Sequence, residues 1–337
     1  MMEGNVTSLT SAEISNLWST YVNDSIVACL LTHFAETVTD DEIRPLIDEM
    51  LNVANGHLRA IEQLFAAEGI AKPVGYPVEK HVYSGAPKLF SDIFYLEYMY
   101  HMTKFGIASH SGAIALASRQ DIADLFRAFL NEAVTLNDRT RHVLLEKGVY
   151  IRPPYMVYPK QAEFIEKQRF LTGWFGPRRP LLAIEVAHLF TTARNNELGK
   201  ATLTGFAQVA VDPEIRNFFL RGVRVCSDIM NTVHDVLRES NVPAVMSPDV
   251  TVTDSTKPPF SDQLMMAVIN ALSVIGTAEY GAAMAVSLRR DIIALYASLI
   301  AKAGAFTEDG ANMMIERRWL EYPPHFLDRQ QLALQKS

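Results

Sequence analysis

The sequence predicts an all-α protein built from two tandem four-helix bundles. An internal repeat is the first observation: residues 90–154 align without a gap with residues 260–324, and fifteen of these 65 aligned positions are identical. Average composition would give only about four. Upstream, residues 17–53 align with residues 189–225 at nearly the same shift. Apolar residues also recur at helical spacing in both copies. The chain therefore contains one helical domain twice.

The length of the chain agrees with this division. At 337 residues a single hydrophobic core is uncommon, and two domains of roughly 150 residues are the usual outcome. We predict a first bundle over residues 1–148, an inter-domain linker over 149–180, and a second bundle over 181–337. Within the linker, a short amphipathic helix is expected near residues 162–170.

The first two helices of copy one are predicted from their ends. Apolar residues recur with helical spacing from Ser11 to Thr37, which predicts helix 1. Thr39 and Glu42 form the Thr-x-x-Glu pattern of a capping box, so helix 2 is expected to begin near residue 41 and to end at Gly69. Because so few residues connect them, these helices should be antiparallel neighbours.

A long connection separates the second helix from the third. Residues 70–88 are rich in proline and glycine, and nineteen residues is long for a helix–helix connection. That length allows the chain to travel back along the bundle. Helix 3 is expected over residues 90–117, and helix 4 from about residue 121 to Gly148, a glycine stop. Four helices with one long crossover between the second and third, running up-down-down-up, are typical of a ferritin-like bundle.

The second copy repeats the same order. Its four helices are expected over residues 180–209, 212–240, 260–287 and 289–318. Within its crossover, residues 250–256 (VTVTDST) begin with alternating apolar and polar side chains, a pattern that allows one short strand.

Composition limits the partners of the chain. Apolar residues make up 49% and charged residues 20%, as in ordinary globular proteins, and the net charge of −7 argues against nucleic acid or an anionic membrane surface as a partner. The segment Leu264–Leu288 is apolar and long enough to span a bilayer. Since it contains Asn270 and Glu279, and its repeat counterpart carries several charges, we interpret it as a central bundle helix.

The cysteines and the N-terminal residues indicate the compartment. Cys29 and Cys226 do not occupy matching positions in the repeat, which favours two core thiols over a disulfide or a shared nucleophile. The opening residues show no secretory signal pattern. We therefore expect a cytoplasmic protein.

A di-iron site of the ferritin type is not expected. Such sites use Glu-x-x-His pairs on two of the helices, and the glutamates of the predicted helices 2 and 4 have no histidine three residues later. A mononuclear site remains a hypothesis. Counting residues along the antiparallel helices places four polar residues at one height in the first bundle: Asp24, His57, His110 and Glu132.

Imidazole and carboxylate ligands suit zinc, iron or manganese. The second copy does not repeat the set, because Asn196, Ile229 and Lys302 replace Asp24, His57 and Glu132. The four residues are thus either a metal site of bundle 1 alone or ordinary polar residues.

Three further features lead to structural predictions. Glu279 lies in the most apolar stretch, where burial would demand a partner, and we predict a buried ion pair with Lys302. Glu185 and His188 are interpreted as a helix-surface or domain-interface pair. Arg119 with Asp121 recurs in the second copy as Arg289 with Asp291, whereas the candidate metal ligands do not recur. This repetition predicts that each Arg–Asp pair fixes the turn between the third and fourth helices of its bundle.

A set of motifs carries a resemblance. Ser-Asp precedes each small-residue helix, and the chain also contains YIRPPY, GWFG, TDST-x-PPFSD, RRD, EDGANMMI and WLEYPP. In these motifs the chain resembles a tandem-bundle family of unknown function from spore-forming Gram-positive bacteria, which is distantly similar to coat-F type spore-coat proteins. The resemblance implies two ferritin-like bundles and brings no catalytic residues with it.

Two hypotheses for the function stay open. One is a non-enzymatic structural or interaction protein linked to sporulation, with homo-oligomers or spore-coat proteins as partners and association with the spore. The other is a metal-binding or oxidoreductase-type bundle that uses the four residues of bundle 1.

Overall fold

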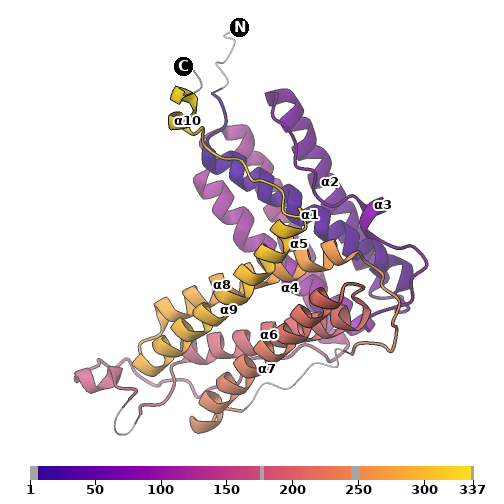
Figure 1. Cartoon of the computed structure of the whole chain (residues 1–337). Helices are drawn as coiled ribbons and strands as arrows, with labels where there is room; N and C mark the ends of the chain where they lie inside the picture. Colours follow the sequence, from indigo (N-terminus) through magenta and orange to yellow (C-terminus); the bar gives the residue numbers. More distant parts are fainter. Residues whose placement is uncertain (1–6, 175–177, 244–250, 335–337) are drawn as a thin grey trace.

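The structure, a computed structural model, describes residues 7–174, 178–243 and 251–334. Every regular element in these ranges is a helix. The helices form two elongated groups that meet at an angle, and after α9 the C-terminal segment runs back along the first group (Figure 1). The prediction of an all-α chain with two tandem bundles is confirmed.

Bundle 1 contains four long helices and one short one: α1 (Ser11–Thr37), α2 (Arg44–Glu68), α3 (Val78–His81), α4 (Asp92–Leu116) and α5 (Gln120–Glu146). Helix α1 packs along α2, and α4 packs along α5. The two pairs join through contacts of α1 with α4 and of α2 with α5. A long crossover, which includes α3, separates α2 from α4, as predicted.

Bundle 2 repeats the arrangement with α6 (Ala183–Val209), α7 (Pro213–Glu239), α8 (Asp262–Val286) and α9 (Arg290–Glu316); α10 (Arg329–Leu334) follows. Here α6 packs along α7 and α8 along α9, and the pairs join through α6–α8 and α7–α9. Of the helices described, α8 is the one long and apolar enough to cross a membrane by length and composition. It packs within the bundle and also touches α1.

The linker differs from its prediction. The expected helix near residues 162–170 is replaced by one short 3₁₀ turn, η1 (Gln168–Leu171). Phe164, within the expected helix, is 96% exposed, so its ring does not pack against the described part of the chain. A short helix without tertiary contacts is not stable in water, which explains the difference. The domain boundaries given above stay predictions.

The start of α2 also corrects an expectation. The helix begins at Arg44, and Thr39 does not cap it. Instead the Thr39 hydroxyl donates to Asp92 Oδ2 at 2.6 Å, which ties the α1–α2 turn to the start of α4. In bundle 2 the equivalent helix does have a side-chain cap, because Asp212 Oδ1 accepts from the Glu214 amide at 2.8 Å, and Pro213 occupies the first turn.

The two crossovers lie against each other. Val82 pairs with Phe260, and Phe90 pairs with Val252, as isolated antiparallel bridges. Backbone bonds extend this contact, with the Tyr83 amide donating to the Pro259 carbonyl at 2.8 Å. Of the strand expected over residues 250–256, residue 250 lies outside the described residues. The rest forms a single bridge with the other crossover, because the partner segment continues into helix α4 instead of extending the ladder.

Aromatic side chains join the bundles into one core. Phe90 and Phe260, which are equivalent in the repeat, each reach the first helix of the opposite bundle. The ring of Phe260 lies 5.2 Å from that of His33 on α1, and the ring of Phe90 lies 6.1 Å from that of Phe206 on α6. At Gly205 an added Cβ would come within 2.4 Å of Phe90. The largest apolar cluster accordingly contains residues of both bundles.

Candidate functional site

Three of the four residues singled out in bundle 1 meet through hydrogen bonds. The ring of His57, on α2, lies between two carboxylates: Nδ1 is 2.9 Å from Asp24 Oδ2 on α1, and Nε2 is 2.8 Å from Glu132 Oε2 on α5. The ring also stacks on Phe129, with centroids 3.7 Å apart. Burial alone would lower the pKa of His57, but the hydrogen bonds and charges of both carboxylates outweigh it and raise that pKa.

His110, on α4, lies beside this triad without joining it. Its ring centroid is 5.8 Å from that of His57, and the buried Nδ1 has no hydrogen-bond partner among the described residues. Burial lowers the pKa of His110 to about 4, an effect that the Asp24 charge opposes. At neutral pH the imidazole of His110 is therefore uncharged.

This arrangement does not fit a metal ion as it stands. A metal requires a nitrogen lone pair on each ligating imidazole, whereas both ring nitrogens of His57 already face carboxylate oxygens at hydrogen-bond distance. Within the described ranges, no group of three or more His, Cys, Asp or Glu side chains is placed to hold a metal ion. The contacts instead form a charge-assisted clamp that joins α1, α2 and α5.

The predicted ion pair of Glu279 with Lys302 is wrong. Lys302 is exposed on α9, and no ion pair among the described residues joins it to Glu279. Glu279 instead accepts from the Asn195 side-chain amide. Burial raises the pKa of Glu279, and the charge of Lys104, from bundle 1, opposes that effect. Counting residues predicts the height of a side chain along a bundle but not its direction around the helix axis.

A second cross-bundle contact joins α4 to α6. Arg194 forms an ion pair with Glu97, and both side chains are nearly buried. Burial raises the pKa of Glu97, while the Arg194 charge lowers it. His101, one turn along α4, is buried as well, and burial followed by the Lys104 charge lowers its pKa to about 3. This polar cluster lies at the junction of the bundles. The spacing of residues within one copy of the repeat did not predict it, because its members come from both copies.

Two glutamates that the repeat relates each make several polar contacts. Glu13 Oε1 accepts from the amides of Ser118 and Arg119, both at 2.8 Å, and its Oε2 accepts from the Thr10 amide at 2.7 Å. Burial would raise the pKa of Glu13, but these bonds lower it to about 2. The side chain thus joins the start of α1 to the α4–α5 turn.

Glu185 occupies the same place in bundle 2, where it is fully buried. It accepts from the Arg289 amide at 3.2 Å and the Leu182 amide at 2.9 Å, and Arg179 contacts both of its oxygens. Burial raises its pKa, but the bonds from Arg179 and the backbone lower it to about 2. The interpretation of Glu185 with His188 as a surface or interface pair is therefore wrong. Extending the shift of 172 upstream to residues 13 and 185 would have revealed the relationship.

The repeated Arg–Asp pairs do fix the turns, as predicted. Arg119 contacts Asp121 through Nε at 3.1 Å and through a terminal nitrogen at 2.7 Å. Arg289 contacts Asp291 in the same two-pronged way, with both distances 2.9 Å. Together with the glutamates, these pairs hold each third-to-fourth helix turn against the first helix.

Fold and contacts together define a tandem helical-bundle protein in which the repeated polar residues hold the architecture. The chain belongs to the family described as protein of unknown function DUF3231, whose model matches it twice, over residues 1–162 and 169–332. The resemblance to a tandem-bundle family of unknown function is confirmed.

Comparison with curated proteins gave no match. A solved structure, that of a putative spore coat protein from Bacillus halodurans C-125, is similar to part of the chain. It shows 19% identity and a TM-score of 0.39, covering 45% of this chain and 98% of that one.

Proposed function

We propose that the chain is a structural or interaction protein that assembles with copies of itself in a spore-associated layer. The main observation in support is that the linker exposes large apolar side chains to solvent. The exposed fractions are 88% for Tyr155, 90% for Val157, 83% for Tyr158 and 96% for Phe164. Soluble monomers rarely expose contiguous apolar side chains in this way, and such segments mark contacts with other molecules.

A second exposed apolar segment lies at the other end of the molecule. Phe326 and Leu327 are 85% and 69% exposed in the segment before α10. In Figure 1, α10 lies beyond the end of bundle 1, whereas the pink turn η1 lies at the far end of bundle 2. Two different contact segments at opposite ends favour head-to-tail association, and a head-to-tail interface that does not close forms open chains.

Substitution of the linker tests this assembly. We expect the wild-type chain to grow in mass with concentration in sedimentation velocity, and the triple variant Tyr155→Ser, Tyr158→Ser and Phe164→Ser to stay monomeric with an unchanged circular dichroism spectrum. A control triple, Val74→Ser, Leu116→Ser and Val274→Ser, removes side chains that are 69%, 62% and 61% exposed elsewhere and should assemble normally. A wild-type monomer at all concentrations would contradict self-assembly.

The spore context of the proposal is supported by the motif resemblance described for the sequence. It is tested by deleting the gene in a sporulating host and analysing coat extracts by mass spectrometry. We expect the chain in the wild-type spore fraction as well as in the cytoplasm, and an altered coat composition in the deletion strain. Normal coat composition together with absence of the chain from spores would refute the link.

A mononuclear metal site is the second candidate, and the meeting of Asp24, His57 and Glu132 is the observation that favours it. For a cation to bind, His57 would have to lose a proton and turn a lone pair from a carboxylate toward the ion. Metal content measured by plasma mass spectrometry, on protein purified without chelator or histidine tag, decides between the candidates. Stoichiometric iron, zinc or manganese that disappears in His57→Ala would establish the metal site, and metal-free protein would reject it.

A further inference from the structure

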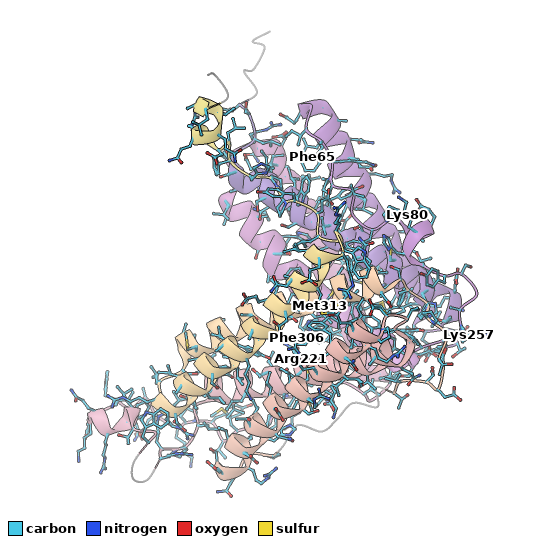
Figure 2. All side chains as sticks on the ribbon, viewed as in Figure 1. Phe65, Lys80, Arg221, Lys257, Phe306 and Met313 are labelled. Atoms are coloured by element: carbon cyan, nitrogen blue, oxygen red, sulfur yellow. The ribbon has the colours of Figure 1, made fainter. Side chains whose placement is uncertain are left out.

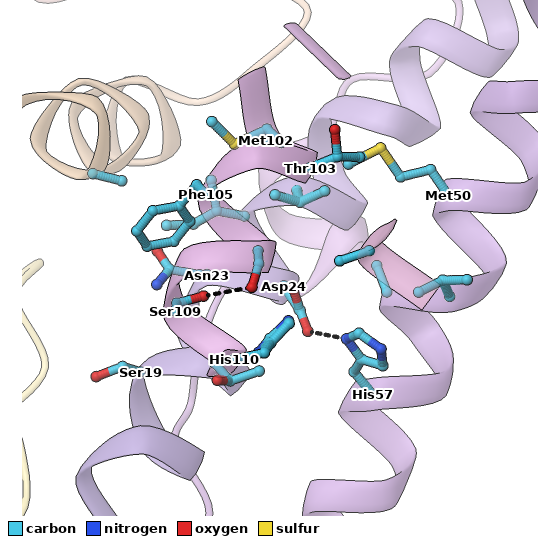
Figure 3. A pocket seen from close by; sticks show the side chains of 18 of the residues that line it. Ser19, Asn23, Asp24, Met50, His57, Met102, Thr103, Phe105, Ser109 and His110 are labelled. Carbon is cyan, nitrogen blue, oxygen red and sulfur yellow. Dashed lines mark hydrogen bonds and ion pairs between the residues drawn. The ribbon is translucent and has the colours of Figure 1, made fainter. Parts of the chain in front are cut away.

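A cavity of about 150 Å³ lies inside bundle 1 (Figure 3). Helices α1, α2, α4 and α5 line it, and α8 of bundle 2 closes one side. Its apolar part includes Met50, Val53, Met102, Leu136, Leu272 and Ile275. An engineered protein cavity of this size holds benzene. The space therefore suits one small ring.

Two polar side chains in the wall of this cavity have unused hydrogen-bonding capacity. Asp24 bonds to His57 through Oδ2, and within the described residues no hydrogen bond reaches its Oδ1. The Nδ1 of His110 is likewise without a partner there. In Figure 3 the carboxylate of Asp24 lies between the rings of His110 and His57. Asp24 is only partly buried, but His110 is buried, and buried polar groups normally find partners. A hydroxyl-bearing ligand would supply the partner that the Nδ1 of His110 lacks.

Bundle 2 shows what fills the equivalent position. The repeat relates Asp24 to Asn196 and His110 to Tyr280. The Asn196 side-chain amide donates to the Tyr280 hydroxyl at 2.7 Å, so a phenol ring of the chain itself occupies the space. The cavity that remains there is smaller, about 80 Å³. Bundle 1 has the polar partner but lacks the phenol.

The charges around the cavity narrow the class of ligand. Its lining contains the carboxylate of Asp24 and neither lysine nor arginine, which disfavours an anion. His57, held between two carboxylates, also lines it and disfavours an added ammonium group. We propose that bundle 1 binds a small uncharged phenol here, with the hydroxyl at Asp24 and His110, as Tyr280 is placed in bundle 2. This ligand site goes beyond the assembly role proposed above.

Binding is tested on the full chain with phenol by isothermal titration calorimetry and with 4-fluorophenol by ¹⁹F NMR. We expect a dissociation constant on the order of 0.1–1 mM, which is reasonable for so small a ligand. Toluene, which lacks the hydroxyl, should bind about tenfold more weakly. Benzoate, which carries a negative charge, should not bind.

The decisive variant is His110→Tyr, which supplies the phenol covalently. It should lose phenol binding and raise Tm by about 2–4 °C. The control is His142→Tyr, the same substitution on the exposed face of α5, which should bind phenol like the wild type. If His110→Tyr does not fold, Ala271→Phe fills the cavity from α8, with Ala282→Phe on the exposed side of the same helix as its control.

Three results would overturn the proposal. One is no binding of phenol to the wild-type chain at millimolar concentration. Another is undiminished binding in the folded cavity-filling variant. The third is binding of benzoate as tight as that of phenol, because the lining would then not select an uncharged ligand.

Discussion

At the scale of single residues, Glu185 is the clearest test of what holds bundle 2 together. The side chain is fully buried and accepts from Arg179 and from two backbone amides across the α8–α9 turn. Glu185→Gln removes the charge that Arg179 faces, and losing one partner of a buried ion pair costs about 3–5 kcal/mol. We expect that loss in the free energy of unfolding at pH 7, measured by urea denaturation.

The pH dependence of this loss follows from the low pKa of Glu185. A carboxyl group with a folded pKa of about 2 and an ordinary unfolded pKa stabilises the fold fully above the unfolded value, and the contribution disappears as pH falls toward 2. The difference in the free energy of unfolding between wild type and Glu185→Gln should therefore be constant from pH 5 to 8 and should decrease below about pH 4. A gap that stays constant to pH 3 would contradict this explanation.

His57 should show the opposite dependence. Its pKa is raised in the fold, so its clamp is fully present below the unfolded value of about 6.5 and is lost as pH rises through the folded pKa. The groups that face it are Asp24 from α1, His110 from α4 and Glu132 from α5. We expect His57→Gln to destabilise the chain by about 2 kcal/mol at pH 6.

The effect of His57→Gln should become smaller by pH 9. The other buried histidines have lowered pKa values and contribute equally to both proteins. Subtracting the free energy of unfolding of the variant from that of the wild type at each pH therefore removes their contributions. Urea denaturation at pH 6, 7.5 and 9 provides the measurement. A difference that grows with pH would show that His57 is neutral in the fold.

At the scale of helices and their connections, the repeated Ser-Asp motif caps the third helix of each bundle and contacts a neighbouring turn. Ser91 caps its own helix, with Oγ accepting from the Phe94 amide at 3.2 Å, while Asp92 accepts from Thr39 in the α1–α2 turn. In bundle 2, Asp262 accepts from the Asp212 amide at 2.8 Å in the α6–α7 turn. The motif therefore sets where each third helix begins and which turn it contacts.

The close contact of α6 with the first crossover gives a prediction at this scale. An added Cβ at Gly205 would meet the Phe90 ring, so Gly205→Ala should cost about 1–3 kcal/mol through overpacking. Gly304 lies exposed within α9 with no atom near its added Cβ. There the same substitution should stabilise by about 0.5–1 kcal/mol. Thermal unfolding of both variants tests the contact, and equal shifts would refute it.

At the scale of the whole molecule, the shared core predicts that the bundles stay together when the linker is cut. Limited tryptic digestion should cleave at the exposed Lys160 or Lys167. We expect the halves to co-elute in gel filtration, because the core cluster and the Glu97–Arg194 ion pair join them without the linker. Separate elution of two folded halves would show that each bundle is independent.

Much of the fold could be predicted because the signals are local. The bounds of α1 match those expected, and the other long helices lie within about three residues of theirs. Helical periodicity, glycine and proline positions and the capping acid at Asp212 act over one or two turns, so the sequence displays them directly. The cap predicted at Thr39 is absent, because the Thr39 hydroxyl instead donates to Asp92, a carboxylate far away in the sequence. Local patterns do not reveal such a competing partner.

Residues close together in the chain, or a comparison of its two halves, were enough to predict the all-α class, the tandem repeat, the helices and the Arg–Asp pairs that fix the turns. Three features became visible with the packing of the helices in space: the charge that Glu279 faces, the packing of Phe90 and Phe260 against the opposite bundle, and the cavity beside Asp24 and His110. These features depend on the rotation of each helix about its axis and on the volumes of side chains that meet across it, and residue spacing gives the height of a side chain but neither of these.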